Sequence, residues 1–513
     1  MVSTASSYAA FERRLSRLMA RTLESATGFC GYASQDVAFR LVQRCAELGV
    51  FEFTRVSAEK YRLNATLPAD TEAIVCGVLL FEADGTVRLK NVAAMQLLLE
   101  FFAYWCFVFL RIFASFRPKI SPGRVSMLYG VGRQDLNAGG SDLRFLDFCR
   151  SGPVGPLRNA DRLVVQSEQS FLSTDPMRVR YGRVPLLDAL RWSGLGFRTW
   201  LLALRQHIES ALGFIQALRG LPLLLLLGRD AANHAVAAAL NRGGNLQDVI
   251  LTNSDYFSQP LWFWALPHKR FASHIVWYSQ NGYPISYVDE REAVSIPNLR
   301  YVRADVQWVW NDGFKNFLEA ICPKCDFEVV SPVIWCLPSK TAILARDSPR
   351  IALFDVTPVS ELTEQKFGLL RNFYSESVMS GFIRDVVEVA QAVGSDFGIS
   401  IEIVLKHKRH PKAGFHSSSY FDVVEKFVQD GSLKVIDPAS NMFDFVSASD
   451  VVIAAPYSSP VYVGRHLVKN SFWYDPTENL DWKLEVQEIP LVQGRERLRT
   501  KMMESFVNPS MYS

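Results

Sequence analysis

Apolar runs of strand length recur along the chain with helical stretches between them, and this alternation limits the fold more than any other feature. Helical patterns at 185–219 and 229–241 separate several of the runs. Continuous apolar strands that alternate with helices are typical of a parallel sheet covered on both faces. The runs of the first half, all predicted as strands, are "RVSMLYGVG" (124–132), "DRLVVQS" (161–167), "LPLLLLLG" (221–228), "DVILTNS" (248–254), "HIVWYSQ" (274–280) and "VQWVWND" (306–312).

The same pattern restarts after a polar, proline-containing stretch at 345–350. Strand-like runs begin near 351, 400, 433, 451 and 471, and helical stretches lie between most of them. The sequence therefore predicts an α/β protein with two Rossmann-like domains that face a cleft at the carboxyl ends of their strands. A chain of 513 residues is also too long for one ordinary core.

Four segments are predicted from this pattern. They are an accessory α+β extension at 1–120, an N-terminal Rossmann-like acceptor domain at 121–345, a C-terminal Rossmann-like nucleotide-sugar domain at 346–490 and a tail at 491–513. The extension includes a hairpin pattern in which Asp84 and Gly85 supply the tight turn.

An aromatic-rich helix is predicted at 95–117, and it has three interpretations. Glu100 and Arg111 leave only 101–110 without charge, whereas a transmembrane helix needs roughly 20 apolar residues. Its aromatic side chains and the cations that follow suit a helix lying in a membrane interface. A buried helix between two domains explains the same run, so interfacial contact and burial both stay open.

A basic loop at Lys406 to His416, "KHKRHPKAGFH", stands out in a chain whose net charge is only +3. That weak overall charge does not indicate a nucleic-acid-binding protein. The loop directly follows the apolar strand "IEIVL", and Pro411 restricts His410 to extended geometry. A solvated surface loop is the ordinary alternative, but this placement favours an anion site.

Two other loops of the second half also follow strands: "DVTP" (355–358) and "YSSP" (457–460). In a parallel sheet all three loops meet at one edge, where helix N-termini favour anions. We therefore expect a phosphate or diphosphate of a nucleotide to bind there. The predicted donor-binding residues are Thr357, Lys406, Lys408, Arg409, His410, Pro411, Ser458 and Ser459.

These stretches resemble bacterial GT-B glycosyltransferases that build surface polysaccharides, over about residues 125–480. His410-Pro411 and Ser458-Ser459 look like the HP and SS motifs of bacterial sialyltransferases and related Kdo transferases. The resemblance implies that both pairs hold the CMP moiety of a nucleotide-activated sugar donor. The first half looks like surface-carbohydrate biosynthesis proteins of the same broad class. The acidic-acidic-glycine motif of sialyltransferases is absent, since Asn311 to Gly313 departs from it, so the resemblance does not identify the catalytic base.

The acceptor domain offers three candidates for acid/base catalysis: Asp142, Asp255 and His274. An inverting glycosyl transfer needs a base near the acceptor hydroxyl. The two aspartates follow strand-like runs, but "GGSD" and "TNSD" also look like helix starts, where aspartate caps the backbone. The role of each carboxylate therefore stays open at this point.

The first function that the sequence predicts is a glycosyltransferase with a glycan or glycolipid acceptor in polysaccharide or lipopolysaccharide synthesis. Two alternatives are a CDP-glycerol-type phosphotransferase and a non-catalytic sugar-nucleotide-binding subunit of an assembly complex. Cys322 and Cys325 form a CxxC without a second pair, so we expect no metal and no cofactor. Cysteines inside apolar runs suit the cytoplasm. The helix at 95–117 leaves open a peripheral contact with the inner face of the cytoplasmic membrane.

Overall fold

The structure is a computed structural model, and it describes part of the 513-residue chain. The described residues are 18, 29–45, 74–76, 79–81, 87–89, 91–116, 123–129, 148–149, 157, 161–166, 179–193, 195–252, 259–277, 279, 288, 299, 302–322, 325–330, 332, 348–360, 373–412, 415–481 and 489–507.

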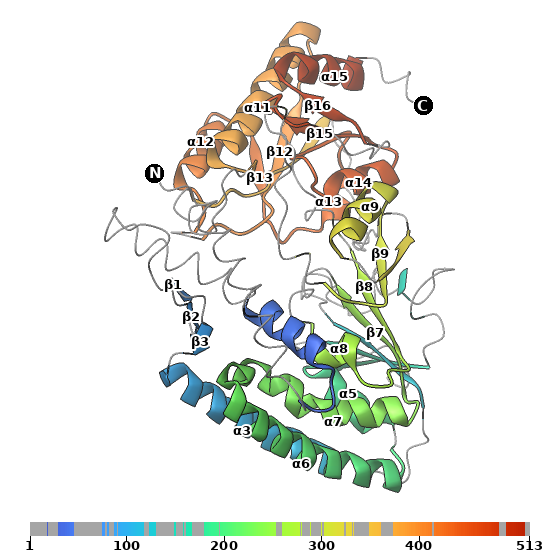
Figure 1. Cartoon of the computed structure of the whole chain (residues 1–513). Helices are drawn as coiled ribbons and strands as arrows, with labels where there is room; N and C mark the ends of the chain where they lie inside the picture. The colour runs from blue at the N-terminus through green and yellow to red at the C-terminus, as the bar shows by residue number, and fades with distance from the viewer. Residues whose placement is uncertain are drawn as a thin grey trace.

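The N-terminal domain contains a parallel sheet in the order β10-β9-β8-β7-β4-β5-β6 (Figure 1). Counted along the chain, this is the Rossmann order 3-2-1-4-5-6 with one further strand. From β4 the chain adds β5 and β6 on one side, and from β7 it adds β8 to β10 on the other, so the parallel neighbours β4 and β7 form the switch point. The strands are β4 Val125–Leu128, β5 Arg162–Gln166, β6 Val179–Gly182, β7 Leu246–Thr252, β8 Ala272–Val276, β9 Val306–Val309 and β10 Asp326–Val329.

The C-terminal domain contains a second parallel sheet, in the order β13-β12-β11-β14-β15-β16. This is again the Rossmann order, with β11 and β14 at the switch point. Two parallel sheets of this order confirm the predicted fold of two Rossmann-like domains. The strands are β11 Arg350–Phe354, β12 Glu402–Lys406, β13 Lys434–Ile436, β14 Val451–Ala454, β15 Asn470–Asp475 and β16 Leu491–Gln493.

Helices cover both faces of the second sheet. Alternate strand residues face two different cores: Leu353 and Ile453 pack with α11, α12 and α15, whereas Phe354 and Ala454 pack with α13 and α14. This follows from the two-residue period of a strand. The helices of this domain are α11 Glu376–Phe397, α12 Ser418–Gln429, α13 Met442–Ser447, α14 Pro460–His466 and α15 Arg495–Val507.

The strand predicted at 221–228 is wrong. Pro222–Leu227 forms the 3-10 helix η2, which leads directly into α7. Its leucines are buried, and a short apolar run buried on all sides has no period that separates strand from helix. The helices of the N-terminal half are α3 Asn91–Ala114, α5 Pro185–Ser193, α6 Phe197–Gly220, α7 Gly228–Arg242, α8 Leu261–Ala265 and α9 Asp312–Ile321.

The segments predicted as extension and tail are built into the two domains. Val37 and Leu41, in a helix at 34–45, share one core with Phe101 of α3 and with the N-terminal sheet. At the other end, β16 pairs with β15, and α15 packs on α11. The short antiparallel strands β1 Ile74–Cys76, β2 Leu79–Phe81 and β3 Val87–Leu89 precede α3. The predicted turn at Asp84 and Gly85 lies outside the described residues.

The two domains meet through an aromatic contact. Trp310, just after β9, packs edge-on against Tyr462 of α14 with ring centroids 4.8 Å apart. A backbone hydrogen bond from Val288 to Asn479, 2.9 Å long, also joins the two halves. Trp310 belongs to the same core as Trp473 of β15, so the C-terminal domain provides its packing.

Candidate nucleotide site

The buried carboxylate of Asp355 organises the carboxyl edge of the second sheet. It accepts hydrogen bonds from His407 Nδ1 at 2.6 Å, Tyr420 Oη at 2.7 Å and the backbone N–H of Lys408 at 2.8 Å. All of these side chains except Lys408 are buried. Burial, followed by the charge of Asp355, raises the pKa of Tyr420 well above its usual value, so its hydroxyl stays a donor. The cluster therefore fixes the first turn of the basic loop.

Strand register brings the three predicted loops to one level. Phe354 of β11 pairs with Lys406 of β12 on one side and with Ala454 of β14 on the other. Neighbouring strands lie about 4.8 Å apart, so the ends of β12 and β14 are separated by about 10 Å. The loops after β11, β12 and β14 thus share one edge, at the switch point where nucleotides bind in doubly wound sheets.

The loop after β11 is joined to the far end of the basic loop. Val359 and His416 form an isolated antiparallel bridge, and the N–H of Ser360 donates to Phe415 O at 2.9 Å. Thr357 is buried, and its hydroxyl accepts from the N–H of Arg409 at 3.1 Å. Thr357 therefore holds the backbone of the basic loop at Arg409.

The cations of the basic loop lean toward β13. Lys406 Nζ donates to Pro438 O at 2.5 Å, and His410 Nε2 lies 3.8 Å from Asp437 Oδ1, with both side chains 65% exposed. Arg409, His410 and the neighbouring Pro411 are exposed. The structure thus brings these residues to the predicted edge, on the side away from β14.

Both its surroundings and a neighbouring cation lower the pKa of Lys408. Desolvation, followed by the charge of Arg409, lowers the pKa of Lys408 to about 8. The residue as a whole is exposed, and water screens the interaction between exposed charges. A bound anion would raise this pKa again, because an opposite charge favours the protonated amine.

The loop between β14 and α14 has a strained residue at its centre. Tyr457 has φ +62°, a left-handed conformation that is rare without glycine. The hydroxyl of Ser458 donates to Ala455 O, and Ser458 O accepts from Trp473 Nε1 at 2.9 Å, so this serine is held by its own domain. Ser459 is partly exposed, and its side chain makes no capping bond to α14. Of the two serines, Ser459 is the better placed to contact a ligand.

Of the three residues predicted as catalytic in the N-terminal domain, the structure describes only His274. Asp142 and Asp255 lie outside the described residues. His274 lies inside β8, is buried and contacts Asp248 Oδ1 at 3.3 Å through Nε2. Its Nδ1 accepts from Trp308 Nε1 at 3.2 Å. With both ring nitrogens occupied, His274 is placed for a structural role in the sheet.

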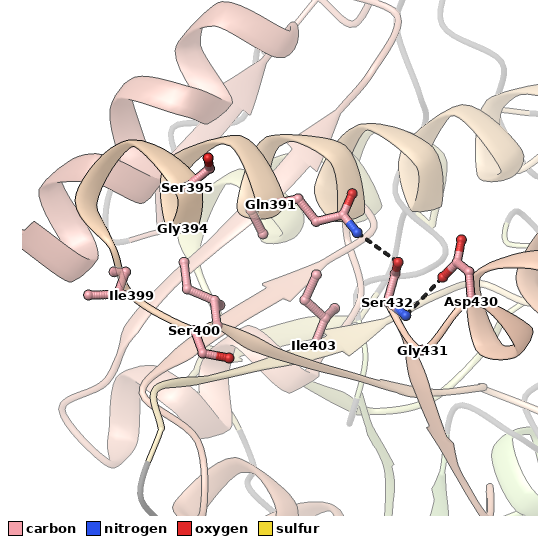
Figure 2. A pocket seen from close by; sticks show the side chains of 11 residues that line it. Gln391, Gly394, Ser395, Ile399, Ser400, Ile403, Asp430, Gly431 and Ser432 are labelled. Carbon is pink, nitrogen blue, oxygen red and sulfur yellow. Dashed lines mark hydrogen bonds between the residues drawn. The ribbon is translucent and has the colours of Figure 1, made fainter.

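A surface pocket of about 360 Å³ lies elsewhere in the C-terminal domain (Figure 2). Gln391 of α11, Ile401 and Ser432 are among its lining residues, and Gln391 Nε2 donates to Ser432 Oγ at 2.7 Å. This places it at the amino-terminal end of β12, on the edge opposite Asp355. Within the described part of the chain, no group of three potential metal ligands occurs.

Sequence reasoning missed three residues of this site: Asp355, His407 and Tyr420. The only sequence signal was an aspartate at the end of an apolar strand. Its partners lie 52 and 65 positions further along the chain, so the cluster becomes visible only after folding.

The solved structures found by structural comparison share little sequence identity with this chain. A mutant of TarM from S. aureus, in a complex that includes UDP, is 10% identical with a TM-score of 0.34, over 55% of this chain and 53% of that one. The pneumococcal O-GlcNAc transferase GtfA is 11% identical with a TM-score of 0.31, over 55% and 54%. UDP-GlcNAc 2-epimerase from Neisseria meningitidis is 8% identical with a TM-score of 0.37, over 76% and 93%. The match thus spans about half the length of TarM and GtfA, and the fold is assigned here from the two parallel sheets themselves.

A comparison with curated proteins finds no match. Residues 211–502, more than half of the chain, match the model of a family described as "Polysaccharide biosynthesis PFTS motif protein". The chain belongs to this polysaccharide biosynthesis PFTS motif family.

Proposed function

We propose that the protein is a GT-B-type glycosyltransferase that moves a sugar from a nucleotide-activated donor, with CMP-linked sugars as the first candidates. The acceptor is a growing surface polysaccharide, lipopolysaccharide or related glycolipid. The observation that carries the proposal is the meeting of three strand-end loops at the switch point of the second sheet, one of them rich in cations. This arrangement suits a nucleotide phosphate, because a cation-rich loop and a hydroxyl-bearing loop follow the strands on either side of β11.

The name of the family adds support for the loop after β14. The sequence does not contain the letters PFTS, but Pro456-Tyr457-Ser458-Ser459 has the same order of residue classes: proline, aromatic, hydroxyl, serine. These residues lie inside the matched range and form the strained loop beside the Asp355 cluster. We infer that this loop carries the family motif and contacts the donor through Ser459.

The donor is identified by a thermal-shift screen of CMP, CDP, UDP and GDP. A ligand that binds only the folded state raises the melting temperature by mass action. We expect the cytidine nucleotides to give the largest shift. A larger shift with UDP would exclude the CMP assignment while keeping the site, and no shift with any nucleotide would contradict the site itself.

Substitutions then test the position of the site. His410→Ala and Ser459→Ala should each weaken nucleotide binding, with a loss of about tenfold to a hundredfold for the hydrogen bond from His410 to a charged phosphate. Lys426→Ala is the matched control, since this exposed cation lies in the last turn of α12 in the same domain. If all three variants bind the nucleotide with equal affinity in calorimetry, the donor does not bind at this edge.

The catalytic base is tested in the acceptor domain, where Asp142 and Asp255 remain our candidates. Replacing the base by Asn should lower kcat by roughly a hundredfold to ten-thousandfold while nucleotide affinity stays unchanged. Turnover of a cytidine donor to give a phosphodiester product would instead identify the phosphotransferase alternative. Nucleotide binding without turnover on any acceptor would identify the binding subunit.

We also propose that the protein works in the cytoplasm and contacts the inner face of the membrane, where a glycolipid acceptor resides. The free thiols of the described cysteines, several of them buried, are consistent with a reducing compartment. Recovery of the protein in soluble and membrane fractions tests this location.

A further inference from the structure

Two long helices of the N-terminal domain expose an apolar face. α3 and α6 lie side by side at the end of the molecule away from the second domain (Figure 1). Leu99, Leu110 and Phe113 of α3 are 64%, 63% and 60% exposed, and Leu201 and Leu212 of α6 are 52% and 63% exposed. Contiguous exposed apolar surface of this kind marks an interaction site in a soluble domain. We call this two-helix face the platform.

The platform is held rigid by bonds between its helices. Trp105 Nε1 donates to His207 O at 3.3 Å, and His207 Nε2 lies 3.1 Å from Trp105 O. Further along, Trp200 Nε1 donates to Ile112 O at 2.8 Å. These bonds join the two helices through groups on their facing sides.

The inner side of α3 is part of the domain core. Phe101, Val108 and Ile112 are buried there among residues of α6 and α7. By length and composition, two described helical stretches are apolar enough to cross a membrane: α3 and 222–242. In the most apolar part of 222–242, 89% of the residues are buried in the domain. In the most apolar part of α3, only 17% of the residues are buried. Because one side of α3 is fixed in the core, the helix is placed to lie on a bilayer, and a span would require removing it from that core.

Charge and hydrogen bonding indicate which occupant fits. Between Glu100 and the end of α3 every exposed position is apolar, and the one charged residue there, Arg111, is half-buried. A protein interface carries about one hydrogen bond per 100–200 Å², and the exposed alanine, leucine and phenylalanine side chains of α3 after Glu100 cannot form them. On α6 the exposed charges are Arg198, Arg205 and Arg219 against Glu209, which is a net positive set. An apolar face with cations beside it complements an anionic lipid surface.

We propose that the platform docks on an anionic lipid bilayer with α3 and α6 parallel to the membrane plane. This proposal rests on the proposed function only in that it names the surface behind the membrane contact. Lipid binding is measured without donor or acceptor, so its failure and the failure of glycosyl transfer are distinguishable.

The first test is co-sedimentation of the full chain with vesicles of phosphatidylcholine alone and of phosphatidylcholine mixed with phosphatidylglycerol. We expect binding to the mixed vesicles, reduced by high salt because exposed charges are screened. No binding to the mixed vesicles would overturn the proposal, and equal binding to both vesicle types would overturn the assignment to anionic lipid.

Paired substitutions locate the contact. Leu110→Ser with Leu201→Ser, and separately Leu99→Ser with Leu212→Ser, should each reduce the vesicle partition coefficient by roughly tenfold or more. Phe397→Ser with Val428→Ser is the matched control, since these side chains are 42% and 41% exposed on the other domain. Partition of the platform variants equal to that of the control would contradict the proposal.

A fluorophore at Cys106 gives a readout that does not depend on a variant folding. Cys106 is an exposed free thiol on the outward side of α3. An environment-sensitive label there should shift to the blue with mixed vesicles and be quenched by spin-labelled lipid, with labelled Cys106→Ser protein as the background control. A label that stays in water while the protein binds vesicles would place the contact elsewhere.

A second copy of the chain is the competing occupant. Light scattering over a range of concentrations should show the same mass for the wild type and for both platform variants. A dimer that the platform substitutions convert to a monomer would assign the platform to self-association and overturn the lipid proposal.

Discussion

At the scale of single residues, one buried carboxylate holds the candidate nucleotide site together. Asp355 receives three hydrogen bonds shorter than 3 Å, two from side chains of the second sheet's loop and helix and one from the backbone. Bonds to a buried charge are worth more than neutral ones, and each unsatisfied partner costs free energy. The shape of the basic loop therefore depends on this residue more than on the exposed cations themselves.

Asp355→Asn is expected to lower the free energy of unfolding by about 2 kcal/mol or more, because an amide cannot accept all of these bonds. Nucleotide affinity should fall together with stability. Asp437→Asn is the control, since this carboxylate is 65% exposed beside His410. Urea unfolding measures both variants, and an unchanged midpoint for Asp355→Asn would contradict the organising role.

Another prediction at this scale concerns pH. Burial, followed by the charge of Arg242, lowers the pKa of His234 from 6.5 to about 4. Between these values the unfolded chain binds a proton that the folded protein does not, so stability is lost as pH falls from about 6.5 to about 4. The loss from this group amounts to at most about 3 kcal/mol. His234→Gln should flatten that part of the stability profile in urea titrations, and an unchanged slope would assign it to other groups.

At the scale of elements, backbone conformation distinguishes a glycine inside α11 from the glycine that caps it. Gly398 ends the helix with φ +63°, where an added Cβ meets no atom but the conformation itself disfavours other residues. Gly381 lies inside the helix, and a Cβ there would make an ordinary 3.9 Å contact with Pro476.

We expect Gly398→Ala to destabilise the protein by about 1 kcal/mol, because it forces a left-handed alanine. Gly381→Ala should stabilise it by about 0.5–1 kcal/mol, because it removes chain entropy from the unfolded state. The two variants serve as controls for each other in thermal unfolding. The same sign for both would show that packing, and not backbone conformation, governs this helix.

At the scale of the whole molecule, a small aromatic contact relates the two domains. Trp310 packs on Tyr462 of α14, the helix that follows the strained loop of Tyr457. A change in the angle between the domains therefore reaches the proposed donor site through one short helix.

Trp310→Ala should leave nucleotide affinity of the C-terminal domain nearly unchanged and lower turnover, because the N-terminal domain loses its fixed orientation. Small-angle X-ray scattering should show a larger radius of gyration for this variant. Tyr462→Phe keeps the ring contact and is the control. An unchanged scattering profile for Trp310→Ala would show that other contacts hold the domains.

The sequence by itself determined the architecture and the edge at which the candidate site lies. Continuous apolar strands such as 351–354 and 403–405 alternate with amphipathic helices, and this local pattern is set by burial on both faces of a parallel sheet. The position of the basic loop and of the "YSSP" loop follows as well, because every loop after a parallel strand is at the same edge. These inferences needed only local periodicity and connectivity.

Only the tertiary structure decided which side chains act together. It formed the cluster of Asp355, His407 and Tyr420 from positions far apart in the chain, turned the leucines of 222–227 into a 3-10 helix, and left one side of α3 exposed. A sequence pattern states that a residue is apolar or charged, but long-range packing sets its partner. For that reason the Asp355 cluster and the platform could be identified only from the packing of distant segments.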